Sequence, residues 1–342
     1  MNYDLNDPTL YRDIIVLYCP KKVGSTSLVS SIRLFATDKF FVFHTHDENI
    51  FTSLHNNNNL TIKNILKNNY RKIYIIDIFR TPIERKMSEF FEELVILHFN
   101  NLPENLIHYP IEKIIKRFND IFPYISTIDY YKDIYDIPFP KEFDFENKYI
   151  SYTSNNITWI KLRLQDSLYW PEILTKIFGT EIKIIKDYES QYKLTSEIYK
   201  KFKNDYKLPY NYYKLMEENN ELNFYLNYEE KIEYLRKWFD NTTTTYSPFN
   251  EYEFNFYIKI SNENKFYDLK KFGHYFDNGC SCNNCFENRK LIIEDIKKNE
   301  QNFDIHKYKP ILHDFNSEYK SNIFIKYFYE NDKIIDMIYT VF

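Results

Sequence analysis

The sequence predicts an α/β fold in which helices flank a parallel sheet. Three short apolar runs, at residues 14–18, 40–43 and 73–79, have the length of buried strands. Between and after them, apolar residues recur at helical spacing. Because strands and helices alternate in this order, the strands are expected to pair in parallel, with helices covering both faces. Ligands of such sheets bind beyond the carboxyl ends of the strands.

The first strand leads into a helix through a short turn. Residues 14–18 are followed by Pro20 and Gly24, which favour a turn, and Ser25 or Thr26 is expected to cap the helix that follows. Residues with helical spacing form its apolar face: Leu28, Ile32 and Phe35. The segment is therefore expected to be strand, turn and helix in immediate succession.

The next segments repeat the alternation. Residues 40–43 form a second strand that ends at His44, and residues 63–68 close a short helix. Residues 73–79 form a third strand. Pro82 is tolerated in the first turn of a helix, so an amphipathic helix is expected to begin there.

The middle of the chain adds further elements. Two more strands are expected at residues 158–164 and 182–185, on either side of a helix at 171–178. Residues 197–203 and 229–238 are also expected to be helical.

A change in composition predicts a division of the chain. After the run Asn241–Thr245 the sequence becomes richer in aromatic, strand-like pieces. We therefore expect an α/β domain over residues 1–245 and an aromatic-rich C-terminal extension over residues 246–342, to which the sequence assigns no role.

Composition and charge exclude several classes of protein. The chain has 342 residues, of which 44% are hydrophobic and 27% charged, which is typical of a globular protein. Its formal net charge is −4 and its basic residues are dispersed, so no nucleic-acid partner is expected. No apolar stretch is long enough to span a membrane, and residues 1–8 are unlike a signal peptide. A cytoplasmic location is expected, and the sequence leaves the oligomeric state open.

The turn after the first strand has the composition of an anion-binding loop. Residues 18–28 read Tyr-Cys-Pro-Lys-Lys-Val-Gly-Ser-Thr-Ser-Leu. Gly24 allows the backbone to approach an anion, and the start of the helix adds N–H groups and the positive end of its dipole. Lys22 adds a positive charge. Because the lysines precede the glycine, this is not a Walker A loop.

A second motif, at residues 79–92, reads Phe-Arg-Thr-Pro-Ile-Glu-Arg-Lys-Met-Ser-Glu-Phe-Phe-Glu. The first loop resembles the 5′-phosphosulfate loop of sulfotransferases, Pro-Lys-x-Gly-Thr-Thr. The second resembles their 3′-phosphate motif, Arg-Asp-Pro followed by Arg and then Ser. The resemblance implies a P-loop NTPase-like sulfotransferase fold. It also implies 3′-phosphoadenosine-5′-phosphosulfate (PAPS) as donor and PAP as product.

The resemblance assigns roles to individual residues. Lys22 would be the catalytic lysine, although the additional Lys21 is an alternative, and Arg80 and Ser88 would hold the 3′-phosphate. Thr81 replaces the aspartate of the family, which should matter little because Arg80 carries the charge. The residues implied in the 5′-phosphosulfate loop are Lys21, Lys22, Val23, Gly24, Ser25, Thr26 and Ser27.

A looser resemblance bears on the acceptor. Residues 162–166 and 225–238 resemble segments of sulfotransferases of the capsular-polysaccharide type, which implies a carbohydrate hydroxyl as acceptor. The Arg-Lys-Gly…Gly-x-Trp-Lys element of cytosolic sulfotransferases is absent. A close relationship to enzymes acting on small phenols or steroids is therefore not expected.

Two histidines are candidates for the general base. His44 and His46 lie at the end of the second strand and alternate with Phe43 and Thr45, so they point to the same face. Histidine is the usual proton acceptor near neutral pH. Either could serve; His46 is favoured because it lies further from the sheet. The pair could instead bind a metal, although the sequence shows no third ligand nearby.

A cysteine cluster raises the possibility of structural zinc. Three cysteines and a histidine form a Cys3His set within residues 274–285: His274, Cys280, Cys282 and Cys285. The compact spacing lacks a second Cys-x-x-Cys pair, so reduced cysteines in a loop are the alternative.

The function expected from these motifs has two rivals. A kinase-like P-loop enzyme is disfavoured because the Walker A motif and an acidic Mg²⁺ partner are missing. A non-catalytic binding protein on a sulfotransferase scaffold is the other. Against it stands the presence of Lys22, Arg80 and Ser88, although these residues show binding capacity more than turnover.

Overall fold

The chain forms two compact units, each built from segments that are separate in the sequence. The first comprises Met1–Arg80, Tyr130–Tyr188 and Leu269–Glu318, and the second comprises Thr81–Asp129, Glu189–Asp268 and Tyr319–Phe342. The computed structural model describes residues 12–46, 61–67, 71–99, 110–121, 131, 134–187, 195–244, 251, 276–277, 279, 283–299, 304–309, 311, 323–330 and 333–341.

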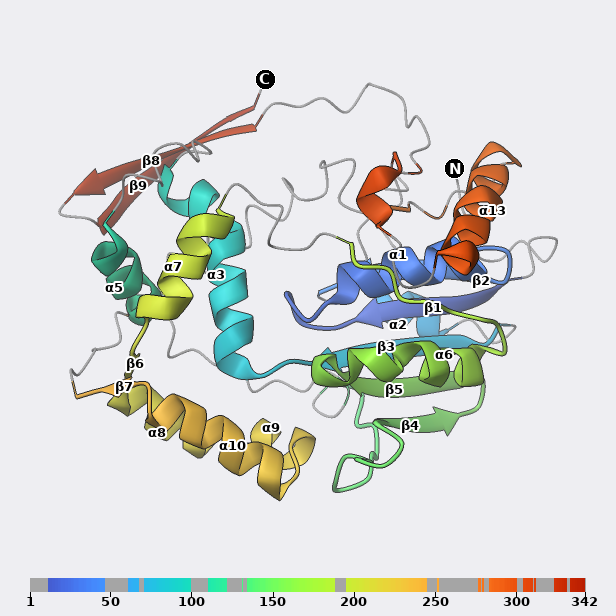
Figure 1. Ribbon diagram of the computed structural model, residues 1–342, viewed down its shortest axis with the longest axis horizontal. Helices are drawn as coiled ribbons and strands as arrows, with labels where there is room; N and C mark the ends of the chain where they lie inside the picture. The colour runs from blue at the N-terminus through green and yellow to red at the C-terminus, as the bar shows by residue number, and fades with distance from the viewer. Residues whose placement is uncertain are drawn as a thin grey trace. The chain divides into compact units, whose positions relative to one another are not determined.

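A five-stranded sheet forms the centre of the first unit, with the order β2-β1-β3-β5-β4 (Figure 1). The pairs β1–β2, β1–β3 and β3–β5 are parallel, whereas β4 is antiparallel to β5. The expected α/β fold with a mostly parallel sheet is thus confirmed. The strands are β1 (Asp13–Tyr18), β2 (Phe40–Thr45), β3 (Ile73–Phe79), β4 (Tyr149–Ser154) and β5 (Ile157–Arg163).

The register of β1 and β2 determines which residues lie side by side just after the ends of the two strands. Tyr18 lies opposite Thr45, and the Cys19 N–H donates to the Thr45 carbonyl at 3.4 Å. Cys19 and His46 follow these two strand ends directly. The carboxyl ends of β1 and β2 therefore bring these two residues side by side.

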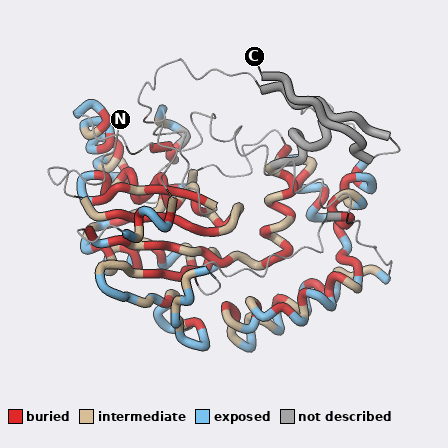
Figure 2. The backbone as a smooth tube through the Cα atoms, turned by 180° about the vertical axis from the view of Figure 1, so that it is seen from behind, coloured by how far each residue is buried: buried red, intermediate tan, exposed pale blue. Residues whose placement is uncertain are grey.

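Helices cover both faces of this sheet. On one face, α1 (Ser25–Ala36) and α6 (Trp170–Phe178) pack against apolar residues of β1, β3 and β5. On the other, α2 (Ile62–Leu66) contributes Ile62 and Ile65 to a second core. The 3₁₀ helix η3 (Leu164–Tyr169) joins β5 to α6. Figure 2 shows buried residues running along the strands, as expected of a sheet covered on both faces.

A late segment of the chain completes the first unit. Helix α13 (Asn283–Lys298) and the 3₁₀ helix η5 (Ile305–Lys307) contribute to a third apolar cluster that includes Leu34 of α1. The Arg33 side chain donates to the Val42 and Asp277 carbonyls. Helix α1 is thus held by β2 and by residues more than 240 positions later in the chain.

The second unit is mainly helical. Aromatic rings from three of its helices pack together, including Phe90, Phe118 and Phe202. Strands β8 (Ile323–Glu330) and β9 (Lys333–Val341) form an antiparallel pair. The helices are α3 (Pro82–Phe99), α5 (Ile111–Ile121), α7 (Ser196–Asp205), α8 (Tyr210–Glu217), α9 (Asn220–Tyr225) and α10 (Tyr228–Phe239), and β6 (Leu208–Pro209) pairs with β7 (Thr242–Thr243).

Two local expectations were wrong. Residues 182–185 are not a strand; the Ile185 N–H donates to the Ser31 hydroxyl at 2.9 Å instead of joining a strand ladder. The N-cap of α1 is Gly24, not Ser25 or Thr26. Ser25 is already helical because Gly24 makes the turn in the left-handed region.

The predicted boundary at residue 245 falls outside the described residues. Each compact unit combines segments from both sides of it, so the structure groups the chain differently. Because contacts within a structure do not establish independent folding, the division at that residue stays a prediction.

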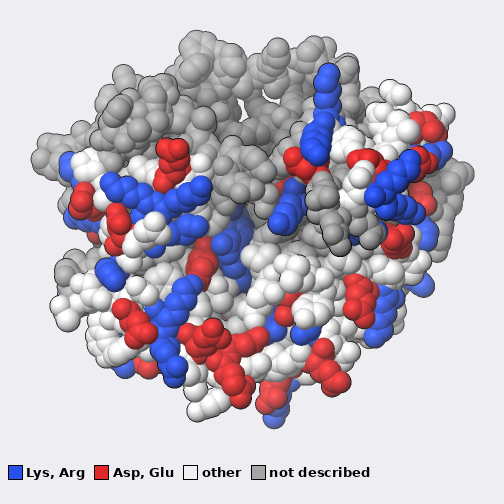
Figure 3. Space-filling model, in the orientation of Figure 1, with Lys and Arg blue, Asp and Glu red and all other residues white. Residues whose placement is uncertain are grey.

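Two surface properties bear on the class of protein. On the face shown in Figure 3, Lys and Arg side chains of the described residues are interspersed with Asp and Glu. Within the part of the chain that the structure describes, no helix has the length and apolar character needed to cross a bilayer.

Candidate functional site

The loop between β1 and α1 adopts a conformation suited to binding an anion. Lys22 and Gly24 both have positive φ angles, 65° and 85°. Left-handed residues within a turn direct successive backbone N–H groups toward one point, which forms a concave anion site. No side chain in the described residues caps α1, and its first-turn N–H groups face the same end.

Close packing beneath the loop explains its glycine. A Cβ atom built on Gly24 would lie 2.8 Å from Leu164 Cδ1 and 3.7 Å from Trp170. Val23 is fully buried, so it can offer only backbone groups to a ligand at the surface. The residues that close the sheet on this side, Leu164 and Trp170, thus hold the loop in place.

The three predicted hydroxyls have different surroundings. Ser25 is buried and hydrogen-bonds the Cys19 thiol. Thr26 is half-buried. The Ser27 hydroxyl donates to the Asp187 carbonyl at 2.9 Å and accepts from the Asp187 N–H at 3.0 Å. Ser27 therefore anchors α1 to Asp187.

The second motif reaches the first through Arg80. Its Nη1 donates a hydrogen bond to the Lys22 carbonyl at 2.7 Å. Both residues are half-buried, as is Lys21. Two motifs that are 58 positions apart in the sequence therefore meet at one end of the sheet.

Ser88, the other residue expected at a 3′-phosphate, lies on α3 in the second unit and is buried. Its proposed role with Arg80 stays a prediction. Arg85 on the same helix lies 4.0 Å from Glu89, an ordinary i,i+4 pair.

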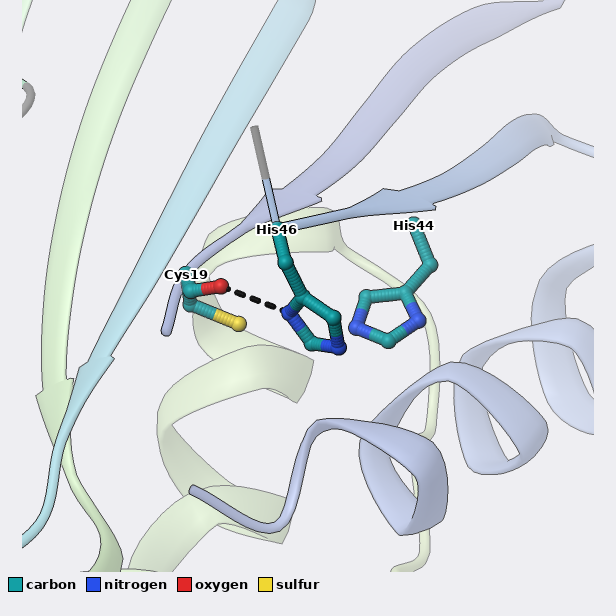
Figure 4. A group of neighbouring side chains, drawn as sticks. All are labelled: Cys19, His44 and His46. Atoms are coloured by element: carbon teal, nitrogen blue, oxygen red, sulfur yellow. Dashed lines mark hydrogen bonds between the residues drawn. The ribbon is translucent and has the colours of Figure 1, made fainter. Parts of the chain in front are cut away.

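Cys19, His44 and His46 form a compact cluster beside the loop (Figure 4). The two imidazoles meet edge to face, with ring centroids 4.5 Å apart. The sequence predicted that both histidines share a face, and they do. Cys19 is fully buried after the end of β1, and its sulfur points toward the histidines (Figure 4).

Hydrogen bonding and burial define the protonation of this cluster. His46 Nδ1 lies 2.8 Å from the Cys19 carbonyl oxygen. A carbonyl can only accept, so Nδ1 carries the proton and, in the neutral imidazole, Nε2 has the lone pair. Burial, and secondarily the charge of Asp77, raise the pKa of the Cys19 thiol well above its usual value, so the isolated thiol is neutral.

Charged pairs occupy the same end of the sheet near β3 and β5. Lys161 is 1% exposed, and its Nζ lies 3.3 Å from Asp77 and over the Tyr131 ring. Arg163 forms two hydrogen bonds with the Asp166 carboxylate. These pairs neutralise buried charge within the unit. Asp77 and Lys161 meet through the pairing of β3 with β5, whereas Arg163 and Asp166 are three positions apart in the sequence.

Comparisons with models of protein families, with curated proteins and with solved structures found no match to this chain. Its function therefore has to be inferred from the chemistry of these residues.

The predicted zinc loop lies largely outside the described residues. His274, Cys280 and Cys282 are not among them. Cys285 is a buried cysteine on α13, packed in the cluster that includes Leu34. The Cys3His set stays a prediction.

Proposed function

We propose that this chain is a sulfotransferase that binds PAPS and transfers its sulfuryl group to a hydroxyl acceptor. The contact between Arg80 and the Lys22 carbonyl is the observation that carries the proposal. It joins the two motifs that resemble the 5′- and 3′-phosphate sites of sulfotransferases. Bringing a guanidinium to an anion-binding loop suits a donor with phosphates at both positions.

In this proposal, each part of the loop has a distinct task. The N–H groups from Val23 to Thr26 hold the 5′-phosphosulfate, and the Lys22 ammonium stabilises the charge that builds on the leaving phosphate. Lys21 is the alternative to Lys22. Arg80, with Ser88, holds the 3′-phosphate.

The transfer is an in-line displacement at sulfur. The acceptor oxygen forms a bond to sulfur as the bond between sulfur and the phosphate oxygen breaks, and PAP leaves. His46 takes the hydroxyl proton on Nε2, and His44 is the alternative. The looser resemblance to capsular-polysaccharide-type enzymes makes a glycan the proposed acceptor class.

Calorimetric titration with PAP and ADP tests the donor site, because PAP carries a 3′-phosphate that ADP lacks. We expect wild-type protein to bind PAP at least tenfold more tightly than ADP. Losing a hydrogen bond to a charged group costs about 1.5–3 kcal/mol, so Arg80→Ala should lower PAP affinity by roughly 10- to 100-fold and leave ADP affinity nearly unchanged. Arg236→Ala, on the exposed face of α10, is the matched control.

The other outcomes favour the rival functions. Equal binding of PAP and ADP to the wild type would support a kinase-like nucleotide enzyme. Absence of binding to both ligands would contradict a donor site at this loop.

A transfer assay separates an enzyme from a binding protein. The protein is incubated with PAPS labelled on sulfur and a panel of polysaccharides, and label in the polymer is counted. Lys22→Ala should lower incorporation by about 10²-fold or more, as loss of a charge-stabilising donor does elsewhere. PAP binding without incorporation into any acceptor would support the non-catalytic scaffold.

A further inference from the structure

We propose that Cys19, His44 and His46 bind a zinc-type transition metal ion, and the structure places no fourth His, Cys, Asp or Glu ligand with them among the residues that it describes. Their three candidate ligand atoms lie within 4.8 Å of one another. Typical zinc bonds of about 2.0–2.3 Å in tetrahedral geometry place ligand atoms roughly 3.3–3.7 Å apart. Modest side-chain rotations close the remaining distance.

The hydrogen bond on His46 prepares it as a ligand. Metal-binding histidines almost always donate their second ring N–H to a carboxylate or a backbone carbonyl, which fixes the tautomer and the ring orientation. His46 Nδ1 makes this bond to the Cys19 carbonyl at 2.8 Å. In the neutral imidazole, this leaves Nε2 as the nitrogen whose lone pair can bind a metal.

The scaffold holds the three groups on rigid elements. His44 lies within β2, and Cys19 and His46 directly follow the paired ends of β1 and β2. Cys19 is 0% exposed and His44 6% exposed, whereas His46 is half-buried. A metal would therefore be shielded by Cys19 and His44 and reached from the His46 side.

The ligand set selects the class of metal. One thiolate with two imidazoles suits Zn²⁺, Co²⁺ or copper, whereas Mg²⁺ and Ca²⁺ require oxygen ligands. This site differs from the predicted Cys3His loop and shares no residue with it.

Metal occupancy has a consequence that rests on the proposed function. A histidine nitrogen bound to a metal cannot accept a proton from a hydroxyl. A metal on both imidazoles would therefore suppress sulfuryl transfer while leaving the loop and Arg80 free to bind PAP. The site would then act as a metal-dependent off switch.

Cobalt spectroscopy tests the site directly. The variant Cys280→Ser/Cys282→Ser/Cys285→Ser leaves Cys19 as the only cysteine, because the chain has four. We expect this protein to bind one Co²⁺ per chain and to show a near-ultraviolet thiolate-to-cobalt charge-transfer band. Adding Cys19→Ser should abolish the band, and His44→Ala or His46→Ala should weaken Co²⁺ binding by about tenfold or more.

A folded single-cysteine protein without the band would overturn the proposal, as would a band unaffected by both histidine variants. Circular dichroism confirms folding. If the triple variant does not fold, the wild type and Cys19→Ser are compared, and an equal Co²⁺ stoichiometry in the two would overturn it. PAP titration of the same samples distinguishes failure of the metal site from failure of the donor site.

Discussion

Gly24 and Gly179 both have positive φ angles, but only Gly24 also lies where a side chain would meet packed atoms. Gly24 (φ 85°) begins α1 above Leu164, whereas Gly179 (φ 62°) ends α6 with nothing within 4 Å of a built Cβ. An L-residue in the left-handed region costs about 1–2 kcal/mol at either position. Only at Gly24 does the side chain also displace packed atoms.

The change Gly24→Ala should therefore destabilise the protein more than Gly179→Ala. Forcing a methyl group into packed surroundings adds about 1–3 kcal/mol to the conformational cost. Urea unfolding of both variants measures the difference. PAP affinity should fall in Gly24→Ala alone, and equal effects of the two changes on stability and on binding would contradict a packed, ligand-binding loop.

At this scale the sequence predicted some contacts and missed others. Lys22, Arg80 and the two histidines could be named as candidate site residues from the sequence, because each follows a predicted strand. The position of Cys19 beside His46 depends on β1 pairing with β2 in one register, which no local pattern in the sequence encodes. Pairs formed across strands, such as Asp77 with Lys161, were missed for the same reason.

Elements with a strong periodic pattern were predictable. The strands at residues 14–18 and 73–79 and the helix at 229–238 match β1, β3 and α10 closely. An apolar run does not specify strand pairing, however. In residues 182–185, the Ile182 N–H instead donates to the Thr175 hydroxyl of α6, and the Ile185 N–H donates to the Ser31 hydroxyl of α1. Helix α13 was missed because its charged residues obscured the apolar positions Ile292 and Ile296.

A buried ion pair joins α13 to Asp277 within the first unit. Asp277 is 0% exposed, and both of its oxygens accept hydrogen bonds at 2.8 Å from Arg289, which is 3% exposed. Asp277→Asn leaves this buried guanidinium without a carboxylate, so we expect a loss of about 3–5 kcal/mol of unfolding free energy, measured by urea denaturation.

The exposed pair on the same helix is the control. Glu287 and Lys290 are more than 60% exposed, and such pairs contribute about 0–1 kcal/mol. Glu287→Gln should therefore change stability by less than about 1 kcal/mol. A similar loss in both variants would show that the buried pair has no special role.

For the whole molecule, the first unit depends on residues beyond 245. The apolar cluster that covers Leu34 takes Phe276, Ile292 and Ile296 from the late segment. Each buried apolar side chain of this size contributes about 1.5–3 kcal/mol, while a domain is stable by only about 5–15 kcal/mol.

A chain ending at residue 245 should therefore fail to fold cooperatively, and that result would contradict the division expected from composition. Calorimetric melting compares it with the full chain. A chain ending at residue 318 retains every segment of the first unit and is the control. Cooperative melting of the 1–245 chain at the melting temperature of the full chain would support the predicted domain over residues 1–245.

The hydrogen bonds from α1 to Asp187 and from Arg33 to Asp277 also set an order of events during synthesis. At about 5–20 residues per second, the ribosome needs on the order of ten to fifty seconds to pass from Arg80 to Glu318. When Arg80 has been made, β1, β2 and β3 are complete, but β4, β5 and the later residues that cover α1 are not. Chaperones that shield apolar surface on nascent chains are therefore expected to engage this protein through α1.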